Sequence, residues 1–97
     1  LIVSGPTKPE NRTPEYYREL CPRLEALGTL LFPRRQRLLY HNQSFEFSQD
    51  GSEDLMQILL EGTDRIKMGL CFDAAMMWRA GGDFERFMAL NADRIEV

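Results

Sequence analysis

Residues 38–47 read LLYHNQSFEF, and these ten residues are the most informative about the fold. Its first three side chains are apolar on consecutive positions, as is typical of a parallel strand that is covered on both faces. The chain then turns polar at His41, Asn42 and Gln43. In parallel α/β proteins the functional residues gather where strands end and helices begin. The stretch therefore predicts a buried parallel strand that delivers polar residues to one edge of a sheet.

Similar strands are predicted on both sides of this one. Strand starts near residues 1, 37, 66 and 94 recur at an interval of about 30 residues, the length of one strand, crossover and loop unit. Parallel pairing with right-handed crossovers follows. We therefore expect an α/β fold with the alternating order βαβαβαβ, in a single partial domain over residues 1–97. The pattern alone does not distinguish a barrel from an open doubly wound sheet.

The first predicted helix starts after Thr13, a good N-cap, with Pro14 at the first helical position. Its apolar stripe recurs at steps of three and four residues and consists of Tyr17, Leu20, Cys21, Leu24, Leu27 and Leu31. Pro22 lies well past the first turn, so we expect a kink or break near residues 19–21. Gly28 is expected to fray the end of this helix.

Two more helices are predicted from their caps. A turn at residues 49–51 precedes Ser52, which is expected to cap a helix with Glu53 and Asp54 in its first turn. That helix is expected to end at residues 62–64. Asp83 is expected to cap another helix, whose buried side chains would be Phe84, Phe87 and Met88.

Composition indicates a globular protein and argues against several partners. The chain has 97 residues, 43% hydrophobic and 28% charged, with a net charge of −3. Nucleic acid is therefore not an expected partner, and the cluster Arg34, Arg35 and Arg37 is interpreted as a solvated turn. No apolar run approaches the roughly 20 residues of a membrane span, so we expect no membrane partner and a cytoplasmic location. Cys21 and Cys71 are expected to be reduced residues of the core.

Three places at predicted strand ends could carry chemistry: residues 4–6, residues 41–46 and the stretch from Asp73 to Trp78. His41 is either a metal or substrate ligand or an ordinary structural histidine. Asp73 follows an apolar strand directly, where a carboxylate is expected to coordinate a cation or to cap the next turn. Glu46 is interpreted first as an outward-facing residue, and Met76, Met77 and Trp78 first as packing residues.

The sequence resembles the sugar phosphate isomerase/epimerase group of the xylose-isomerase-like TIM barrels, which includes inosose dehydratases. The matching segments are residues 39–47 (LYHNQSFEF), Phe72-Asp73, residues 78–83 (WRAGGD) and residues 93–95 (DRI). The resemblance implies a TIM (β/α)8 barrel, of which the chain would cover the third strand to the start of the sixth. It implies a divalent metal (Mn, Mg, Co or Zn) and proton abstraction next to a carbonyl of a sugar or polyol.

The resemblance also implies roles for individual residues. Asp73 and His41 correspond to metal ligands, with Glu46 as a lower-ranked candidate. The substrate-binding positions would be Asn42, Gln43, Met76 and Trp78.

The chain departs from the family pattern at three places: Gln43 replaces a histidine, His41 replaces a carboxylate, and Met76 replaces a histidine or tryptophan. The family's histidine after the sixth strand and glutamate on the eighth would lie beyond Val97. An alternative is therefore a barrel that has lost catalysis and binds a ligand or partner.

A closed barrel needs roughly 250 residues. Both ends of this chain look like cuts. Because the chain offers only two or three candidate metal ligands, we expect it to be inactive alone. It could self-associate through open sheet edges.

Overall fold

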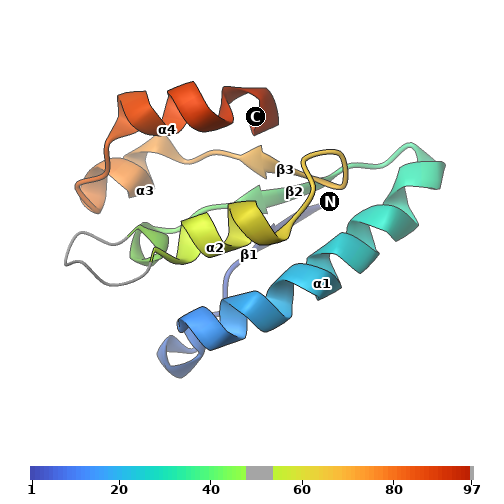
Figure 1. Ribbon diagram of the computed structural model, residues 1–97, viewed down its shortest axis with the longest axis horizontal. Coiled ribbons are helices and arrows are strands. Elements are labelled where there is room, and N and C mark those ends of the chain that lie inside the picture. The colour runs from blue at the N-terminus through green and yellow to red at the C-terminus, as the bar shows by residue number, and fades with distance from the viewer. Residues whose placement is uncertain (48–53, 97) are drawn as a thin grey trace.

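The computed structural model of the protein describes residues 1–47 and 54–96 (Figure 1). Three parallel strands form one sheet in the order β1-β2-β3, and the strands are β1 (Ile2–Ser4), β2 (Leu38–His41) and β3 (Met68–Cys71). Helix α1 (Pro14–Leu31) connects β1 to β2, and α2 (Leu55–Gly62) connects β2 to β3. Helices α3 (Ala74–Arg79) and α4 (Phe84–Asn91) follow β3. The predicted alternating α/β fold with parallel strands is confirmed.

Four short 3-10 turns complete the chain: η1 (Pro9–Asn11), η2 (Phe32–Arg34), η3 (Ser44–Glu46) and η4 (Ala92–Arg94). The expected fourth strand begins as a single parallel bridge between Ile95 and Leu70, with the Glu96 amide donating to the Leu70 carbonyl at 2.9 Å. Its expected last residue, Val97, lies outside the described residues.

The core lies between the sheet and the first two helices. Helices α1 and α2 run side by side (Figure 1), and α1 also packs on β2 and β3. The strand side chains at 38, 40, 68 and 70 are at most 1% exposed, whereas Leu39, His41 and Cys71 on alternate positions are half-buried. Within the described residues, one face of the sheet is therefore covered and the other is partly open.

Helix α1 begins as predicted, since the Thr13 hydroxyl accepts a hydrogen bond from the Tyr16 amide at 3.2 Å. The expected break at Pro22 is wrong, because α1 is one continuous helix of 18 residues. Pro22 lies on its exposed side, where water can replace a missing backbone hydrogen bond. The buried side chains of Tyr17, Cys21 and Leu24 on the opposite side anchor the helix to the core.

Gly28 does not fray α1, which continues to Leu31. The residue is buried, and a β-carbon there would collide with the backbone oxygen of Lys67 just before β3. The glycine thus permits a close approach of helix and strand, which the sequence pattern alone does not reveal.

The caps of the later helices differ from the prediction at one point. Asp54, expected in the first turn of α2, is its N-cap and accepts from the Met56 amide at 3.0 Å. The expected cap Ser52 and the turn at residues 49–51 lie outside the described residues. Asp83 caps α4 as predicted, accepting from the Arg86 amide at 3.0 Å.

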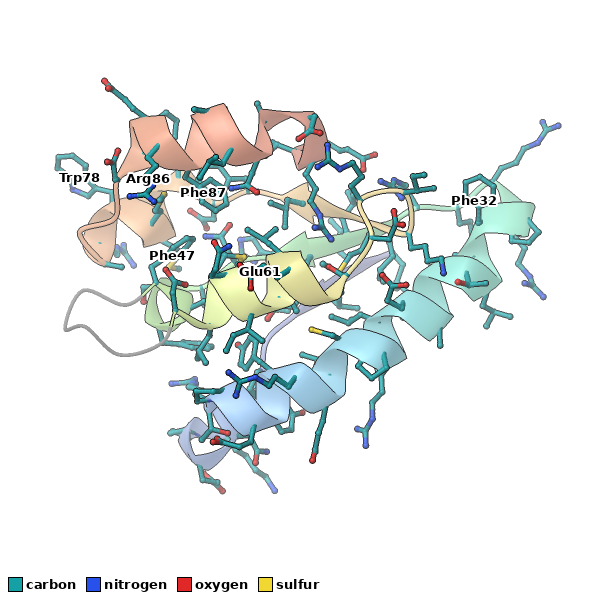
Figure 2. All side chains as sticks on the ribbon, viewed as in Figure 1. Phe32, Phe47, Glu61, Trp78, Arg86 and Phe87 are labelled. Atoms are coloured by element: carbon teal, nitrogen blue, oxygen red, sulfur yellow. The ribbon has the colours of Figure 1, made fainter. Side chains whose placement is uncertain are left out.

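Two aromatic side chains that were expected to pack are exposed. Phe87 and Met77 are buried, but Phe84 is 49% and Trp78 83% exposed. Figure 2 shows Trp78 pointing away from the body of the molecule. Helix α3 has only six residues, and a single short helix cannot bury both Met77 and the adjacent Trp78 against the same neighbour.

The remaining expectations concern the cysteines and the arginines. Both cysteines are free thiols, Cys21 buried and Cys71 half-buried. Arg34 and Arg35 are exposed, as a solvated turn requires, while Arg37 forms an ion pair with Glu96 at 2.8 Å. No helix among residues 1–47 and 54–96 is long and apolar enough to span a membrane.

Candidate functional site

The pairing of β2 with β3 brings His41 and Asp73 together at the carboxyl ends of the strands. His41 pairs in register with Cys71, and Asp73 follows two residues later. His41 Nε2 lies 3.1 Å from Asp73 Oδ2, and their side chains are 33% and 27% exposed. The two strongest candidates from the sequence therefore form one contact that remains accessible to solvent.

Asp73 also begins α3, so its two carboxylate oxygens have different partners. Oδ1 accepts from the Met76 amide at 3.1 Å, and Oδ2 faces His41. The Met76 amide and then the hydrogen bond with His41 lower the pKa of Asp73 below its ordinary value. The carboxylate is therefore ionised at neutral pH, with one oxygen directed to His41.

Asn42 is buried and fixes the backbone at Asp73. Its amide nitrogen donates to the Asp73 carbonyl at 2.9 Å, and its amide oxygen accepts from the Asp73 N–H at 2.6 Å. Only 1% of Asn42 is exposed. These paired bonds continue the connection between β2 and β3 beyond the ends of the strands, so Asn42 positions Asp73. Because Asn42 is buried, it has little surface for contact with a substrate.

Gln43 connects the ends of β1 and β2. Its amide nitrogen donates to Ser4 Oγ at 3.1 Å and lies 3.5 Å from His41 Nδ1, while the Ser4 hydroxyl donates to the His41 carbonyl at 3.0 Å. Ser4 is exposed and Gln43 is half-buried. Of the sequence-predicted substrate positions, Gln43 is the one that lies directly beside His41.

Glu46 was expected to face outward because it lies between two phenylalanines, and this expectation is wrong. It is 0% exposed in turn η3, and three donors surround its carboxylate. The hydroxyl groups of Tyr17 and Tyr40 both donate to Oε2, and the Tyr17 bond is 2.6 Å long. The backbone N–H of Gln43 donates to Oε1 at 2.6 Å. Both oxygens are thus occupied by protein donors, and we leave Glu46 out of the ligand set proposed below.

The electrostatics of this cluster follow from burial. Burial raises the pKa of Glu46, and the hydrogen bonds from Tyr17, Tyr40 and Gln43 oppose that rise. Burial and the charge of Glu46 raise the pKa of both tyrosines. The hydroxyls therefore keep their protons and act as donors.

Sequence reasoning gave the two tyrosines no role in this region, and it named residues 4–6 only as a strand end that could carry chemistry. Tyr17 matched the apolar stripe of α1 and Tyr40 the apolar run of β2, so both were interpreted as core residues. Gly5 follows the first strand, and a β-carbon there would approach Tyr17 Oη, Tyr40 Oη and Glu46 Oε2 to 2.6, 2.7 and 2.9 Å. The position of Gly5 at a strand end was the only sequence indication of this close packing.

The remaining candidates from the sequence are on α3. Met76 lies in the first turn of α3, three residues after Asp73, and is half-buried. Trp78 is largely exposed. Among the described residues, no three histidine, cysteine, aspartate or glutamate side chains come together as a metal cluster. The region therefore contributes a pair of possible ligands, His41 and Asp73.

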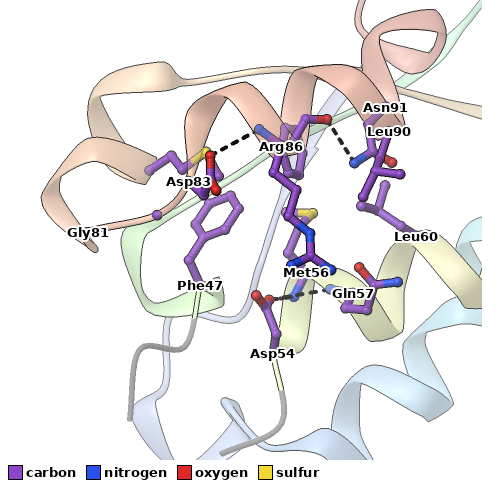
Figure 3. A pocket seen from close by; sticks show the side chains of 13 residues that line it. Phe47, Asp54, Met56, Gln57, Leu60, Gly81, Asp83, Arg86, Leu90 and Asn91 are labelled. Carbon is purple, nitrogen blue, oxygen red and sulfur yellow. Dashed lines mark hydrogen bonds between the residues drawn. The ribbon is translucent and has the colours of Figure 1, made fainter. Parts of the chain in front are cut away.

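A cavity of about 490 Å³ lies elsewhere, between α2 and α4. Figure 3 shows Phe47, Met56, Asp54, Gln57 and Arg86 among the side chains that line it. None of the site residues predicted from the sequence lines this cavity. We therefore locate the candidate site at the strand ends and not in the cavity.

The parallel strands, their helical connections and the polar residues at the carboxyl ends of the strands match part of a TIM barrel. The chain is similar to two crystal structures of sugar phosphate isomerase/epimerases from Parabacteroides distasonis ATCC 8503. The first has a TM-score of 0.81 at 16% identity, covering 97% of this chain and 36% of that chain. The second has a TM-score of 0.80 at 20% identity, covering 98% of this chain and 37% of that chain.

No family model and no curated protein sequence matches the chain. The likeness to the two structures confirms, at the level of the fold, the resemblance inferred from the sequence. The chain spans little more than a third of those proteins.

Proposed function

We propose that the chain is part of a divalent-metal-dependent isomerase, epimerase or related lyase that acts on a sugar or polyol. The observation that carries this proposal is the 3.1 Å approach of His41 Nε2 to Asp73 Oδ2 at the carboxyl end of the sheet. The likeness of the fold to sugar phosphate isomerase/epimerases supports the general class. His41 and Asp73 are the proposed metal ligands.

The donor set fits a divalent cation. A neutral imidazole and an ionised carboxylate are ligands that Mn²⁺, Co²⁺ and Zn²⁺ accept, whereas Mg²⁺ prefers the carboxylate. A cation there would be held by His41 Nε2 and Asp73 Oδ2, which lie 3.1 Å apart. The remaining ligands would come from parts of a whole barrel outside this chain.

The chain's own residues prepare the site in three ways. Asn42 fixes the Asp73 backbone, and the Met76 amide holds the Asp73 carboxylate in its ionised form. Gln43 offers a half-buried amide beside His41 for the hydroxyl groups of a polyol. A bound metal would supply polarisation of a carbonyl and stabilisation of the negative charge that develops when the neighbouring carbon loses its proton.

The alternative is a barrel that binds a sugar or another ligand without catalysis. Gln43 motivates it, because this residue replaces a histidine of the family pattern and its amide is already bonded to Ser4.

Calorimetric titration of the chain with MnCl₂ and CoCl₂ tests the metal site. We expect His41→Ala and Asp73→Asn to weaken binding at least about tenfold, equivalent to about 1.4 kcal/mol. Asn is chosen at position 73 because it can still cap α3. Glu61→Gln, which removes an exposed carboxylate on α2, is the matched control and should bind as the unaltered chain does.

Equal metal binding by the unaltered chain, His41→Ala and Asp73→Asn would contradict the ligand assignment. Binding of a polyol without any metal would favour the non-catalytic alternative.

A further inference from the structure

The Glu46 carboxylate is the one buried carboxylate among the described residues, and it has no part in the proposed ligand set. Two tyrosine hydroxyls and one backbone amide donate to it. Taking a carboxylate out of water is unfavourable unless it is well hydrogen-bonded. The arrangement meets that condition, and the hydrogen bonds of Glu46 connect several segments of the chain.

Those segments are the ones that build the candidate site. Tyr17 belongs to α1, Tyr40 is the residue before His41 on β2, and Glu46 itself lies in η3. Gly5, in the loop after β1, packs directly on the three polar atoms. The cluster therefore holds the ends of β1 and β2 against α1.

Glu46 contacts the chain on both sides of His41. On one side, the Tyr40 hydroxyl donates to Oε2. On the other side, the Gln43 backbone amide donates to Oε1 at 2.6 Å, and the Gln43 side chain lies 3.5 Å from His41 Nδ1. Tyr40, directly before His41, and Gln43, two residues after it, are thus fixed to the same buried carboxylate, while His41 Nε2 faces Asp73.

We propose that Glu46 is a positioning residue that, through Tyr40 and Gln43, holds the His41 imidazole opposite Asp73. Its importance for metal binding rests on the function proposed above, whereas its effect on the His41 geometry does not. Glutamine at this position would keep the shape of the side chain but remove the charge. It would also place an amide group among donors, and the turn that carries Gln43 would rearrange.

The chain's only histidine gives this proposal a specific readout. NMR signals of the imidazole ring in ¹³C,¹⁵N-labelled protein can be assigned to His41 without ambiguity. We expect Glu46→Gln to shift or broaden the ring signals of metal-free protein. Where the unaltered chain binds Mn²⁺ or Co²⁺, the variant should bind it at least tenfold more weakly.

Thr63→Val is the matched control. Thr63 is also buried and bonded, donating to the Leu59 carbonyl at 2.7 Å and accepting from Arg94, but it lies before β3, at the other end of that strand. This variant should lose thermal stability while leaving the His41 signals and metal affinity unchanged. A merely structural role for Glu46 predicts that the two variants behave alike.

Tyr17→Phe keeps the proposal testable if Glu46→Gln does not fold, because it removes one donor and leaves the carboxylate two others. It should change the His41 signals in the same direction by a smaller amount. Unchanged His41 signals in a folded Glu46→Gln or, failing that, Tyr17→Phe variant would overturn the proposal, as would an equal change in Thr63→Val. Metal binding that His41→Ala and Asp73→Asn leave unchanged would overturn the proposed function alone, since the NMR comparison needs no metal.

Discussion

Gly5 is a single residue at which the close packing around Glu46 can be tested. Gly5→Ala should destabilise the protein by about 1–3 kcal/mol, because the added methyl group overpacks three hydrogen-bonded oxygens. Urea unfolding measures the change. Gly82→Ala is the control and should cost less, since the nearest atoms there belong mainly to the flexible Met77 side chain. Equal losses in the two variants would contradict the packing argument.

The two cysteines should react at different rates with a thiol reagent at neutral pH. Cys21 is 5% exposed, and burial, followed by the charge of Glu25, raises the pKa of its thiol. Cys71 is half-buried at the end of β3. Because the thiolate is the reactive form, we expect one fast thiol, removed by Cys71→Ser, and one slow thiol.

In 8 M urea both thiols should react at similar rates. A fast thiol that persists in the native Cys71→Ser variant would contradict the assignment.

The sequence indicated the residues at strand ends but not the direction of their side chains. His41 and Asp73 could be found because each follows an apolar run, and parallel pairing places such residues at one edge. Glu46 lies beyond the strand in a 3-10 turn, where the two-residue alternation of a strand no longer applies. Its burial depends on tyrosines 29 and 6 residues away, which no local pattern specifies.

At the scale of elements, α1 contains a residue that weakens it. Pro22 lacks the amide hydrogen of an interior helical residue, which costs about 3 kcal/mol or more, while its rigidity in the unfolded chain returns about 0.4–1 kcal/mol. We expect Pro22→Ala to raise the free energy of unfolding by about 2 kcal/mol or more. Pro14→Ala, at the first position of the same helix, should give no such gain.

Chemical denaturation of both variants tests this difference. A Pro22→Ala variant that is no more stable than Pro14→Ala would show that α1 already accommodates the proline without cost.

The helices were predicted better than their exact caps and contacts. Periodicity and N-cap residues located α1 and α4, because both signals are local. The N-cap of α2 is Asp54 and not the expected Ser52. Both residue types serve as caps, and their spacing in the sequence does not distinguish between them. The exposure of Phe84 and Trp78 depends on what lies opposite each helix, which is a tertiary property.

For the whole molecule, the described sheet has an open edge at β1. Leu1 and Ile2 there are 61% and 57% exposed, and an unprotected apolar edge strand tends to pair with another chain. We expect self-association that increases with protein concentration, measured by sedimentation velocity. Ile2→Lys should reduce it, whereas Leu90→Lys, at an exposed apolar position on α4, should not.

A monomer at every concentration tested would contradict the role of this edge.

The parallel order of the strands also has a kinetic consequence. Ser4 and His41, which pair in register, are 37 residues apart, and the His41–Asp73 contact closes a span of 32 residues. Such contacts form only after the loss of chain entropy on closing long loops, so high contact order predicts slow folding for a chain of this length. The single histidine takes part in both of these contacts, so the appearance of its native signal would report this slow step during refolding.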